Sequence, residues 1–308
     1  MSDFGRSLFT GIPLEYVVPK TTKVIFVNDF FVKDIEGGAE LTSEAIIQKS
    51  PFKVFKLHSG SVTKKLLESN KDKYWIFGNF TTLPEGMIQY IPFSGIRYSI
   101  VEYDFKFCSY RSTNRHQQHT GQACSCPQDV HGLDIGRMFQ KADRVFWMSE
   151  GQKEAWLKNM PVLKDHSGLI VLSSVFQDSV LDRLKELREQ VCERSPKWVV
   201  LGSGSWIKGV EETQKWCKLN RKPFEVLPKL PYGQFLEALS KYQGFVFMPL
   251  DKDTCPRVTI EAKLMGLNLH LNENVLSKND LWFKGTPEEC DAYLRGRASF
   301  FWKELPVS

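Results

Sequence analysis

The chain has 308 residues, of which 42% are hydrophobic and 25% are charged, and this ordinary balance excludes a largely disordered protein. Its length fits two domains of common size or one large α/β unit. The 41 lysines and arginines exceed the 36 acidic residues only slightly, giving a net charge of +5 that is spread along the chain. Such a weak charge favours small anionic ligands, and we expect no nucleic-acid partner.

The sequence carries no signal for export or membrane insertion. Its N-terminus has no basic stretch followed by an apolar run, so no secretory signal is predicted. No window approaches the roughly 18 apolar residues of a membrane-spanning helix, although peripheral membrane contact stays open. We therefore expect a cytoplasmic protein whose seven cysteines remain reduced.

Short apolar runs alternate with helical patterns through the first half of the chain. Helices are predicted at 37–49 and 133–142. This alternation predicts βαβ units and a mostly parallel sheet. The predicted strands are 23–27, 52–57, 74–77, 98–102 and 144–148.

The same alternation resumes in the second half. Helices are predicted at 179–192, 210–219, 232–242 and 258–265, and the predicted strands are 169–172, 198–201, 224–227, 245–248 and 267–271. The fold class is therefore α/β, with two Rossmann-like halves facing each other across a cleft. Pro161 and the polar turn at 165–168 predict a boundary that gives domains 1–165 and 166–308. Ligands of such proteins bind at the carboxyl ends of parallel strands.

Two segments depart from this rhythm. The stretch 287–302 reads as an aromatic-rich helix, and such a helix at the end of the chain could cross back to the first domain. The stretch from about 105 to 131 has no clear periodicity, and we interpret it as an insertion in the first domain.

A pair of glycines, Gly37 and Gly38, precedes the first predicted helix. Glycines let the backbone approach a ligand closely, and a helix N-terminus offers N–H groups to an anion. An ordinary glycine-rich turn is the alternative. The GxGxxG fingerprint is absent, so a nicotinamide cofactor is not expected.

A second candidate lies where the strand 198–201 ends. The polar turn 202–205 follows this strand, and Lys208 stands where the chain enters the next helix. A lysine beside helix N–H groups suits a diphosphate, while a solvated surface lysine is the alternative. The sequence does not match the Walker A loop.

A third candidate follows the strand 245–248. Asp253 lies in a proline-containing loop, and Glu261 lies eight positions later in a helix that begins near Arg257. Both carboxylates could face one ligand and accept hydrogen bonds from sugar hydroxyls, and Arg257 could meet a phosphate. The alternative is that these charged residues, taken one by one, simply lie on a solvent-exposed surface.

The order of these features resembles the retaining glycosyltransferases of the GT-B fold, in particular glycosyltransferase family 4. The segment 37–40 matches the GGxE-like loop of that family, and 142–149 matches its "ADxVxxxS" strand. Lys208-Gly209 matches the "KG" helix start, and Asp253-x7-Glu261 resembles the E-x7-E element. The resemblance covers most of residues 23–275.

The resemblance implies transfer of a sugar from a nucleotide-diphosphate sugar to an acceptor hydroxyl, with retention and without a catalytic cofactor. Lys208 and the N–H groups at 257–259 would bind the diphosphate, Asp253 would contact the donor sugar, and Glu261 would hold the ribose. The acceptor would be a glycan, a lipid or a protein. The implied donor-binding residues are Gly37, Gly38, Ser203, Lys208, Arg257, Val258, Thr259 and Glu261.

The chain departs from the family pattern at three places. Ser203 stands where the family usually has an arginine, and Asp253 replaces the first glutamate. The family often has a histidine near the donor sugar, and this chain has Glu102, Tyr103 and Asp104 there. Either one of these three joins Asp253 as a catalytic residue, or the departure reduces activity.

The insertion is rich in cysteine and histidine. Cys108, His116, Cys124 and Cys126 are separated by seven, seven and one residues. Three cysteines and one histidine match the ligand complement of a structural zinc site, although the spacing is not that of a standard finger. A disulfide or redox role and unliganded side chains are the alternatives. The insertion's Lys106, Arg111 and Arg115 could instead face an acidic acceptor or a donor phosphate.

Three other functions remain open. A non-catalytic nucleotide-sugar or glycan-binding protein on the GT-B scaffold is the main alternative, favoured by Tyr103 and Ser203. A sugar-phosphate epimerase or a phosphorylase would use the same fold, but no epimerase histidines or pyridoxal lysine stand out. A nucleic-acid modifier would draw only on the diffuse charge and the Cys/His cluster.

Overall fold

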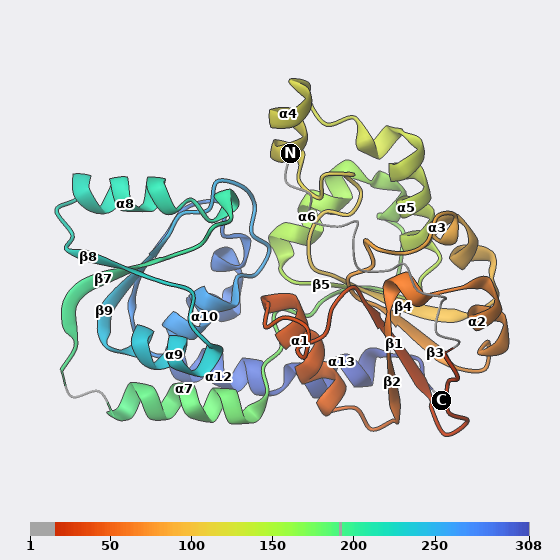
Figure 1. The fold of residues 1–308 in the computed structure, drawn as a ribbon, viewed down its shortest axis with the longest axis horizontal. Coiled ribbons are helices and arrows are strands. Elements are labelled where there is room, and N and C mark those ends of the chain that lie inside the picture. The colour runs from red at the N-terminus through yellow and green to blue at the C-terminus, as the bar shows by residue number, and fades with distance from the viewer. Residues whose placement is uncertain (1–15, 191–192, 308) are drawn as a thin grey trace.

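The computed structural model describes residues 16–190 and 193–307 and shows two α/β halves side by side (Figure 1). Each half is built on a parallel sheet, of six strands in the first and four in the second. The α/β fold class predicted from the sequence is confirmed. No helix in either described stretch combines the length and apolarity needed to cross a bilayer.

The first sheet has the strand order β2-β1-β3-β4-β5-β6. Every residue of β1 and β3 is buried, because helices cover both faces of a parallel sheet and these two strands are predominantly apolar. The strands are β1 (Val24–Asn28), β2 (Val54–His58), β3 (Tyr74–Phe77), β4 (Arg97–Glu102), β5 (Arg144–Trp147) and β6 (Leu169–Val171).

The helices of the first half include several that the sequence pattern did not predict. One of them, α6, is mostly polar and buries only Gln152 and Trp156, so its apolar stripe is too thin to detect. Its start is nevertheless marked, because the Ser149 side chain accepts a hydrogen bond from the N–H of Gln152. The helices are α1 (Gly38–Gln48), α2 (Lys64–Ser69), α3 (Met87–Tyr90), α4 (Thr113–Thr120), α5 (Val130–Gln140) and α6 (Glu150–Asn159).

The second sheet has the order β10-β9-β7-β8. The strands and helices predicted from residue 179 onward are all present, and the last two residues of the predicted helix 179–192 lie outside the described residues. The strands are β7 (Ser195–Leu201), β8 (Phe224–Leu227), β9 (Tyr242–Phe247) and β10 (Asn268–Leu271). The helices are α7 (Asp178–Gln190), α8 (Val210–Leu219), α9 (Tyr232–Ser240), α10 (Arg257–Leu264), α11 (Leu281–Lys284) and α12 (Pro287–Arg295).

The division between the halves lies later than the sequence predicted. A boundary at residue 165 assigns the strand at 169–172 to the second domain, but β6 pairs with β5 and therefore belongs to the first sheet. The first sheet thus extends to Val171, and the chain enters the second half at α7. The sequence of so short a strand does not indicate which sheet it joins, so the boundary could not be placed from the sequence.

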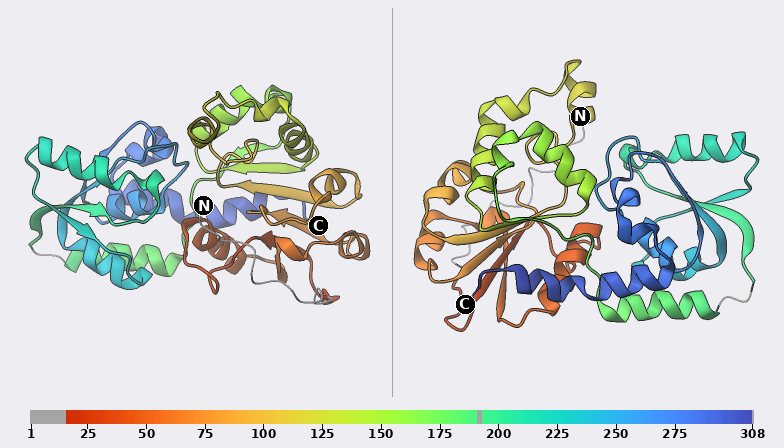
Figure 2. Two further views of the ribbon diagram at one scale, coloured as in Figure 1. Left: turned by 45° about the horizontal axis from the view of Figure 1, so that its top comes forward. Right: turned by 180° about the vertical axis from the view of Figure 1, so that it is seen from behind.

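The end of the chain returns to the first half (Figure 2, right). The predicted helix 287–302 is two helices, α12 and α13 (Arg297–Glu304), which meet at Gly296. Phe301 packs on Phe146 of β5 with ring centroids 4.5 Å apart, and the Trp302 indole donates to the Ile46 carbonyl at 2.8 Å. These contacts bury α13 against the first sheet and tie the two halves together.

The segment predicted as an insertion contains α4, a 3-10 turn at 126–128 and the first residues of α5. The helix α4 stands out at the edge of the first half (Figure 1). It is almost entirely polar, with His116 its only buried residue, which explains why no helical pattern is visible. Ser112 caps its start, and Gly121 ends it with a φ of 71°.

Candidate functional site

The order of the second sheet places two loops together. Strands β7 and β9 are neighbours, but the chain runs from β7 to β8 on one side and from β9 to β10 on the other. The loops after β7 and β9 therefore begin side by side and lead in opposite directions, which makes this a topological switch point. In open parallel sheets this point is where ligands bind. It brings together the segments carrying Lys208 and Asp253, which are 45 residues apart in the sequence.

Lys208 and Asp253 form an ion pair at this switch point. The Lys208 Nζ lies 2.7 Å from the Asp253 Oδ2 and sits over the Phe247 ring at 5.5 Å. The side chains are 32% and 17% exposed, so both are held in place while remaining open to solvent on one side. Two residues that the sequence assigned to one donor therefore do lie side by side.

The glycine after Lys208 has a clear structural reason. Gly209 has a φ of 60°, and a Cβ atom there would overlap the Met248 carbonyl at the end of β9. Nearby, the Leu250 N–H donates to the Ile207 carbonyl at 2.8 Å. The Lys-Gly pair thus lets the loop after β7 lie directly against the loop after β9.

Replacing Gly209 with alanine should therefore destabilise the second half by about 2 kcal/mol or more, from backbone strain and the clash with Met248. Gly204→Ala is the matched control, because a Cβ at Gly204 in the same loop meets no atom within 4 Å. Urea denaturation should show a lower midpoint for Gly209→Ala alone. Equal midpoints for the two variants would contradict this account of the loop.

Arg257 and Glu261 form a buried pair at the start of α10. The Arg257 Nε lies 3.6 Å from the Glu261 Oε1, and the Tyr232 hydroxyl donates to the same oxygen at 2.7 Å. Burial raises the pKa of Glu261, and Arg257 and Tyr232 act against this rise. Glu261 is 2% exposed, so in this structure its carboxylate faces protein rather than solvent.

Arg257 joins the two halves. Its guanidinium donates to the Val175 carbonyl at 2.6 Å and to the Thr42 hydroxyl of α1 at 3.5 Å, and it stacks on Phe176 at 3.7 Å. A Cβ at Gly38 would lie 3.6 Å from the Arg257 Cδ. The glycine pair of the first half and the arginine of the second, predicted to share a donor, therefore meet.

The other predicted residues near these helix starts make only local contacts, within their own loop or helix start. Thr259 is buried and its hydroxyl donates to the Pro256 carbonyl at 2.8 Å, while Val258 is partly exposed. The Ser203 hydroxyl accepts from the Ser205 N–H at 3.1 Å in the loop after β7. Gly37 caps α1, and the Glu40 carboxylate folds back over it, so a Cβ there would overlap that carboxylate.

The three residues after β4 are all engaged by protein partners. Glu102 is fully buried, pairs with the Lys106 Nζ at 2.8 Å, and accepts from two backbone N–H groups. Burial raises its pKa, which Lys106 opposes. The Tyr103 hydroxyl bonds to the Ser43 hydroxyl at 2.6 Å, and Asp104 pairs with Arg111 and Lys106.

Burial of Asp104 raises the pKa of its carboxyl, but Lys106 and Arg111 outweigh burial and hold that pKa below its usual value. Asp104 is therefore charged at neutral pH and keeps Arg111 oriented toward the loop after β3. There the Arg111 guanidinium also donates to the Asn79 side-chain Oδ1 at 2.8 Å. Arg111 thus links the segment after β4 to the loop after β3 within the first half, whereas Arg115 is exposed on α4.

Sequence reasoning missed Asp29 at the end of β1. Its carboxylate accepts from the N–H groups of Thr81 and Thr82 at 3.0 Å and from the Ser59 hydroxyl at 2.5 Å. Burial raises the pKa of Asp29, but these hydrogen bonds outweigh it and hold the pKa below its usual value. Asp29 thus fixes the loop after β3, at the switch point of the first sheet. Its position just after a buried strand was the available signal.

Hydrogen bonds bridge the loops at the carboxyl ends of the two sheets. The Thr254 hydroxyl donates to the Tyr103 carbonyl at 2.8 Å, and the Ser112 hydroxyl donates to Asp251. Sequence reasoning missed Ser112 and Asp251, which no local pattern connects. The cleft predicted between the halves is bridged by these contacts.

The predicted metal residues also come together. Cys108, His116, Cys124 and Cys126 place their ligand atoms within 4.8 Å of one another beside the junction.

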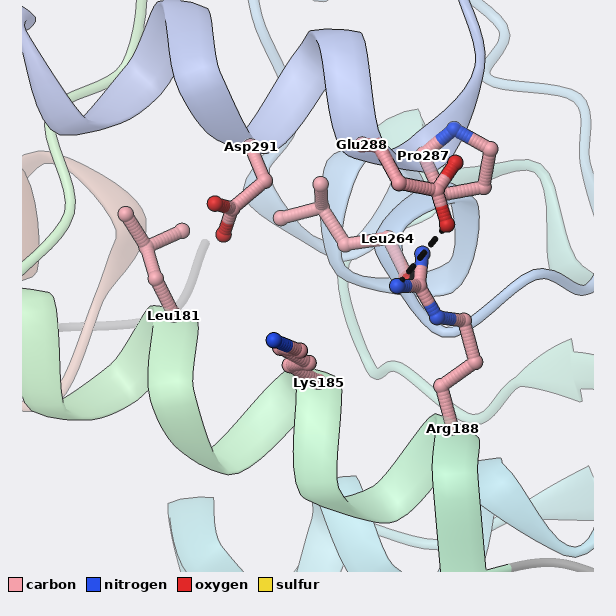
Figure 3. Close-up of a pocket in the computed structure, with 7 residues that line it drawn as sticks. All are labelled: Leu181, Lys185, Arg188, Leu264, Pro287, Glu288 and Asp291. Atoms are coloured by element: carbon pink, nitrogen blue, oxygen red, sulfur yellow. Dashed lines mark hydrogen bonds and ion pairs between the residues drawn. The ribbon is translucent and has the colours of Figure 1, made fainter.

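A separate cavity lies away from these residues. It has a volume of about 190 Å³ and lies between α7 and α12 (Figure 3). Arg188 and Glu288 close one end with an ion pair of 2.9 Å, while Lys185 and Asp291 line it. Each of its charged residues already has an ion-pair partner within the protein, and none of the predicted donor-binding residues lines it.

No protein-family model matches the sequence, and no curated protein matches it. Solved structures match the fold along almost its whole length. The catalytic domain of starch synthase IV from Arabidopsis thaliana, bound to ADP and acarbose, has a TM-score of 0.55 at 11% identity, covering 92% of this chain and 93% of that chain.

Two further structures match in the same way. A trehalose-6-phosphate synthase, OtsA, has a TM-score of 0.54 at 10% identity and 92% coverage of both chains. An α-glucosyltransferase in complex with UDP-glucose and DNA has a TM-score of 0.50 at 10% identity, covering 91% of this chain and 92% of that chain. At such low identity the likeness concerns architecture alone. With its two parallel sheets and returning C-terminal helix, the chain has the GT-B fold.

Proposed function

We propose that this protein is a glycosyltransferase that moves a sugar from a nucleotide-diphosphate sugar to an acceptor hydroxyl. The observation that carries the proposal is the Lys208–Asp253 pair at the switch point of the second sheet. It lies on a fold of which two solved examples hold ADP and UDP-glucose. A point cation beside a carboxylate suits a ligand that joins a diphosphate to a sugar.

The reaction develops negative charge on the leaving nucleotide diphosphate as its bond to the sugar breaks. Lys208 would stabilise this charge by exchanging Asp253 for a phosphate oxygen, and the N–H groups at the start of α10 would add fixed dipoles. Arg257 would add a second cation from the buried side. These groups act at the phosphate itself, so the proposed reaction requires no catalytic cofactor.

The carboxylates take complementary roles in this proposal. Asp253, released from Lys208, would accept hydrogen bonds from the donor sugar hydroxyls. Glu261 would accept from the ribose once the halves separate, exchanging its contact with Tyr232. Gly37 and Gly38 would let α1 approach the donor from the first half. Retention of configuration follows the resemblance to family 4.

The acceptor is proposed to be a glycan, a lipid or a protein, since the small net charge is too diffuse for a nucleic-acid surface. We further propose that the protein acts in the cytoplasm. DNA belongs in the acceptor panel as a contrary outcome, because one α-glucosyltransferase of this fold is complexed with DNA.

The test is nucleotide release by the purified full-length chain from UDP-, ADP- and GDP-sugars, with and without candidate acceptors. We expect release from one donor well above the protein-free rate, and more with the true acceptor. If folded protein releases nucleotide from none of these donors, the proposal fails.

A non-catalytic binding protein on the same scaffold is the second candidate. The observation that favours it is the engagement of Glu102, Tyr103 and Asp104 with protein partners, which leaves none of them as a free catalytic group in this structure. A thermal-shift screen separates the two, since a ligand that binds only the folded state raises its melting temperature. Stabilisation by a nucleotide sugar without any turnover would support the binding protein.

A further inference from the structure

Four metal-ligating side chains from separate parts of the insertion meet at one point. Cys108 comes from the loop after β4, His116 from α4, and Cys124 and Cys126 from the segment after α4. The His116 Nδ1 lies 3.2 Å from the Cys126 Sγ and 3.9 Å from the Cys108 Sγ. Within the described part of the chain, this is the one group of its kind.

The spacing of these atoms fits tetrahedral zinc. With zinc bonded to sulfur at about 2.3 Å and to nitrogen at about 2.0 Å, neighbouring ligand atoms are about 3.5–3.8 Å apart. The two sulfur–nitrogen distances lie on either side of this range. Thiolate and imidazole ligands select zinc rather than magnesium or calcium. Four protein ligands, three of them buried, leave no open position, as in a structural site.

The surrounding segment needs such an anchor. The eight residues of α4 bury little besides His116, and so short a polar helix gains little stability from apolar packing. Before it, Arg111 holds a left-handed backbone conformation with a φ of 57°, which is strained for a non-glycine residue. Bonds from one ion to His116 and to the three cysteine thiols would hold both α4 and the strained backbone of Arg111 in place.

The cluster also encloses two residues with long-range contacts, one of which reaches the second half. Arg111 and Ser112 lie between Cys108 and His116 in sequence, and the Cys108 thiol contacts the Ser112 carbonyl at 3.3 Å. Arg111 reaches Asp104 and Asn79, and Ser112 reaches Asp251 in the second half. Fixing the cluster therefore fixes how the insertion meets the loop that precedes Asp253.

We infer that Cys108, His116, Cys124 and Cys126 bind one zinc ion, and that this ion holds the segment 108–126 so that Arg111 reaches Asp104 and Ser112 reaches Asp251 in the second half. The ion has a structural role and does not enter the proposed glycosyl transfer. The site stands on its own geometry and does not depend on the proposed function.

Elemental analysis of the full-length chain, produced with added zinc, tests the inference. We expect about one zinc per chain in the wild type and almost none in Cys108→Ser and His116→Ala. The matched controls are His119→Ala, on the same helix and stacked on Tyr110, and Cys217→Ser, a buried thiol in the second half. Both controls should keep their zinc.

A second measurement on the wild type covers the case in which a ligand variant fails to fold. Removing the metal with a chelator should lower the melting temperature by several degrees, and zinc, but not magnesium, should restore it. Hydrogen exchange in 108–126 should rise on metal removal while exchange in the second sheet stays unchanged.

Three results would overturn the inference. These are a reconstituted wild type without zinc, an unreduced protein whose mass shows a disulfide among the three cysteines, and a folded His116→Ala variant with full zinc content. Zinc content is measured without any sugar or acceptor, so this outcome is independent of the glycosyltransferase assay.

Discussion

Replacing Lys208 with alanine should lower kcat/KM for the nucleotide-sugar donor by about 10²–10³-fold, the usual loss when a positioned charge-stabilising group is removed. The lysine is held 2.7 Å from Asp253, so it is already oriented before the donor arrives. The loss should appear in initial rates of nucleotide release. Lys208→Arg keeps the charge and should retain part of the activity.

The matched control for this substitution is Lys215→Ala, which removes an exposed lysine from α8, the helix that follows Lys208. It should leave kcat/KM unchanged, and both variants should keep the wild-type melting temperature within a few degrees. A Lys208→Ala enzyme that is folded and as active as the control would remove Lys208 from the proposed mechanism.

Arg257→Met should lower the free energy of unfolding by about 2–3 kcal/mol at pH 7, because Glu261 is left buried without its cation. The variant can avoid a buried charge by keeping Glu261 protonated, which costs about 1.4 kcal/mol for each pH unit above the ordinary carboxyl pKa. Since a raised folded pKa lowers stability as the pH rises, the loss should shrink to below about 1 kcal/mol at pH 5. Urea denaturation at the two pH values measures this difference.

The double variant Arg257→Met/Glu261→Gln is the control for this explanation. It removes the titrating group, so it should recover much of the stability at pH 7 and lose the difference between pH 5 and pH 7. A loss in Arg257→Met that is the same at both pH values would instead indicate that packing on Phe176 and the bond to Val175 carry the effect.

The regular elements were predictable where local pattern and burial agree. The apolar run 74–77 is β3, which is buried throughout, and the amphipathic pattern that begins at 179 lies in α7, which buries three leucines on one face. The helices α4 and α6 were not visible, since they bury only one or two residues each. The boundary after β6 was also hidden, because it depends on which sheet the strand joins.

The candidate site divides in the same way. Lys208 and Asp253 were predicted to meet one donor because their motifs match family 4 in order, and the structure places both at one switch point. The ion pair of Glu102 with Lys106 was not predictable, because burial of the carboxylate follows from the packing around β4. The contact of Ser112 with Asp251 joins residues 139 positions apart, so the sequence alone gave no reason to pair them.

A crystal structure with the nucleoside diphosphate of the active donor bound is the most direct test of the central claim. The diphosphate should contact Lys208 and the start of α10, and the ribose should reach Glu261. Opening of the bridge between Thr254 and Tyr103 should accompany its entry. A nucleotide bound elsewhere, such as in the cavity between α7 and α12, with the Lys208–Asp253 pair intact, would contradict the account.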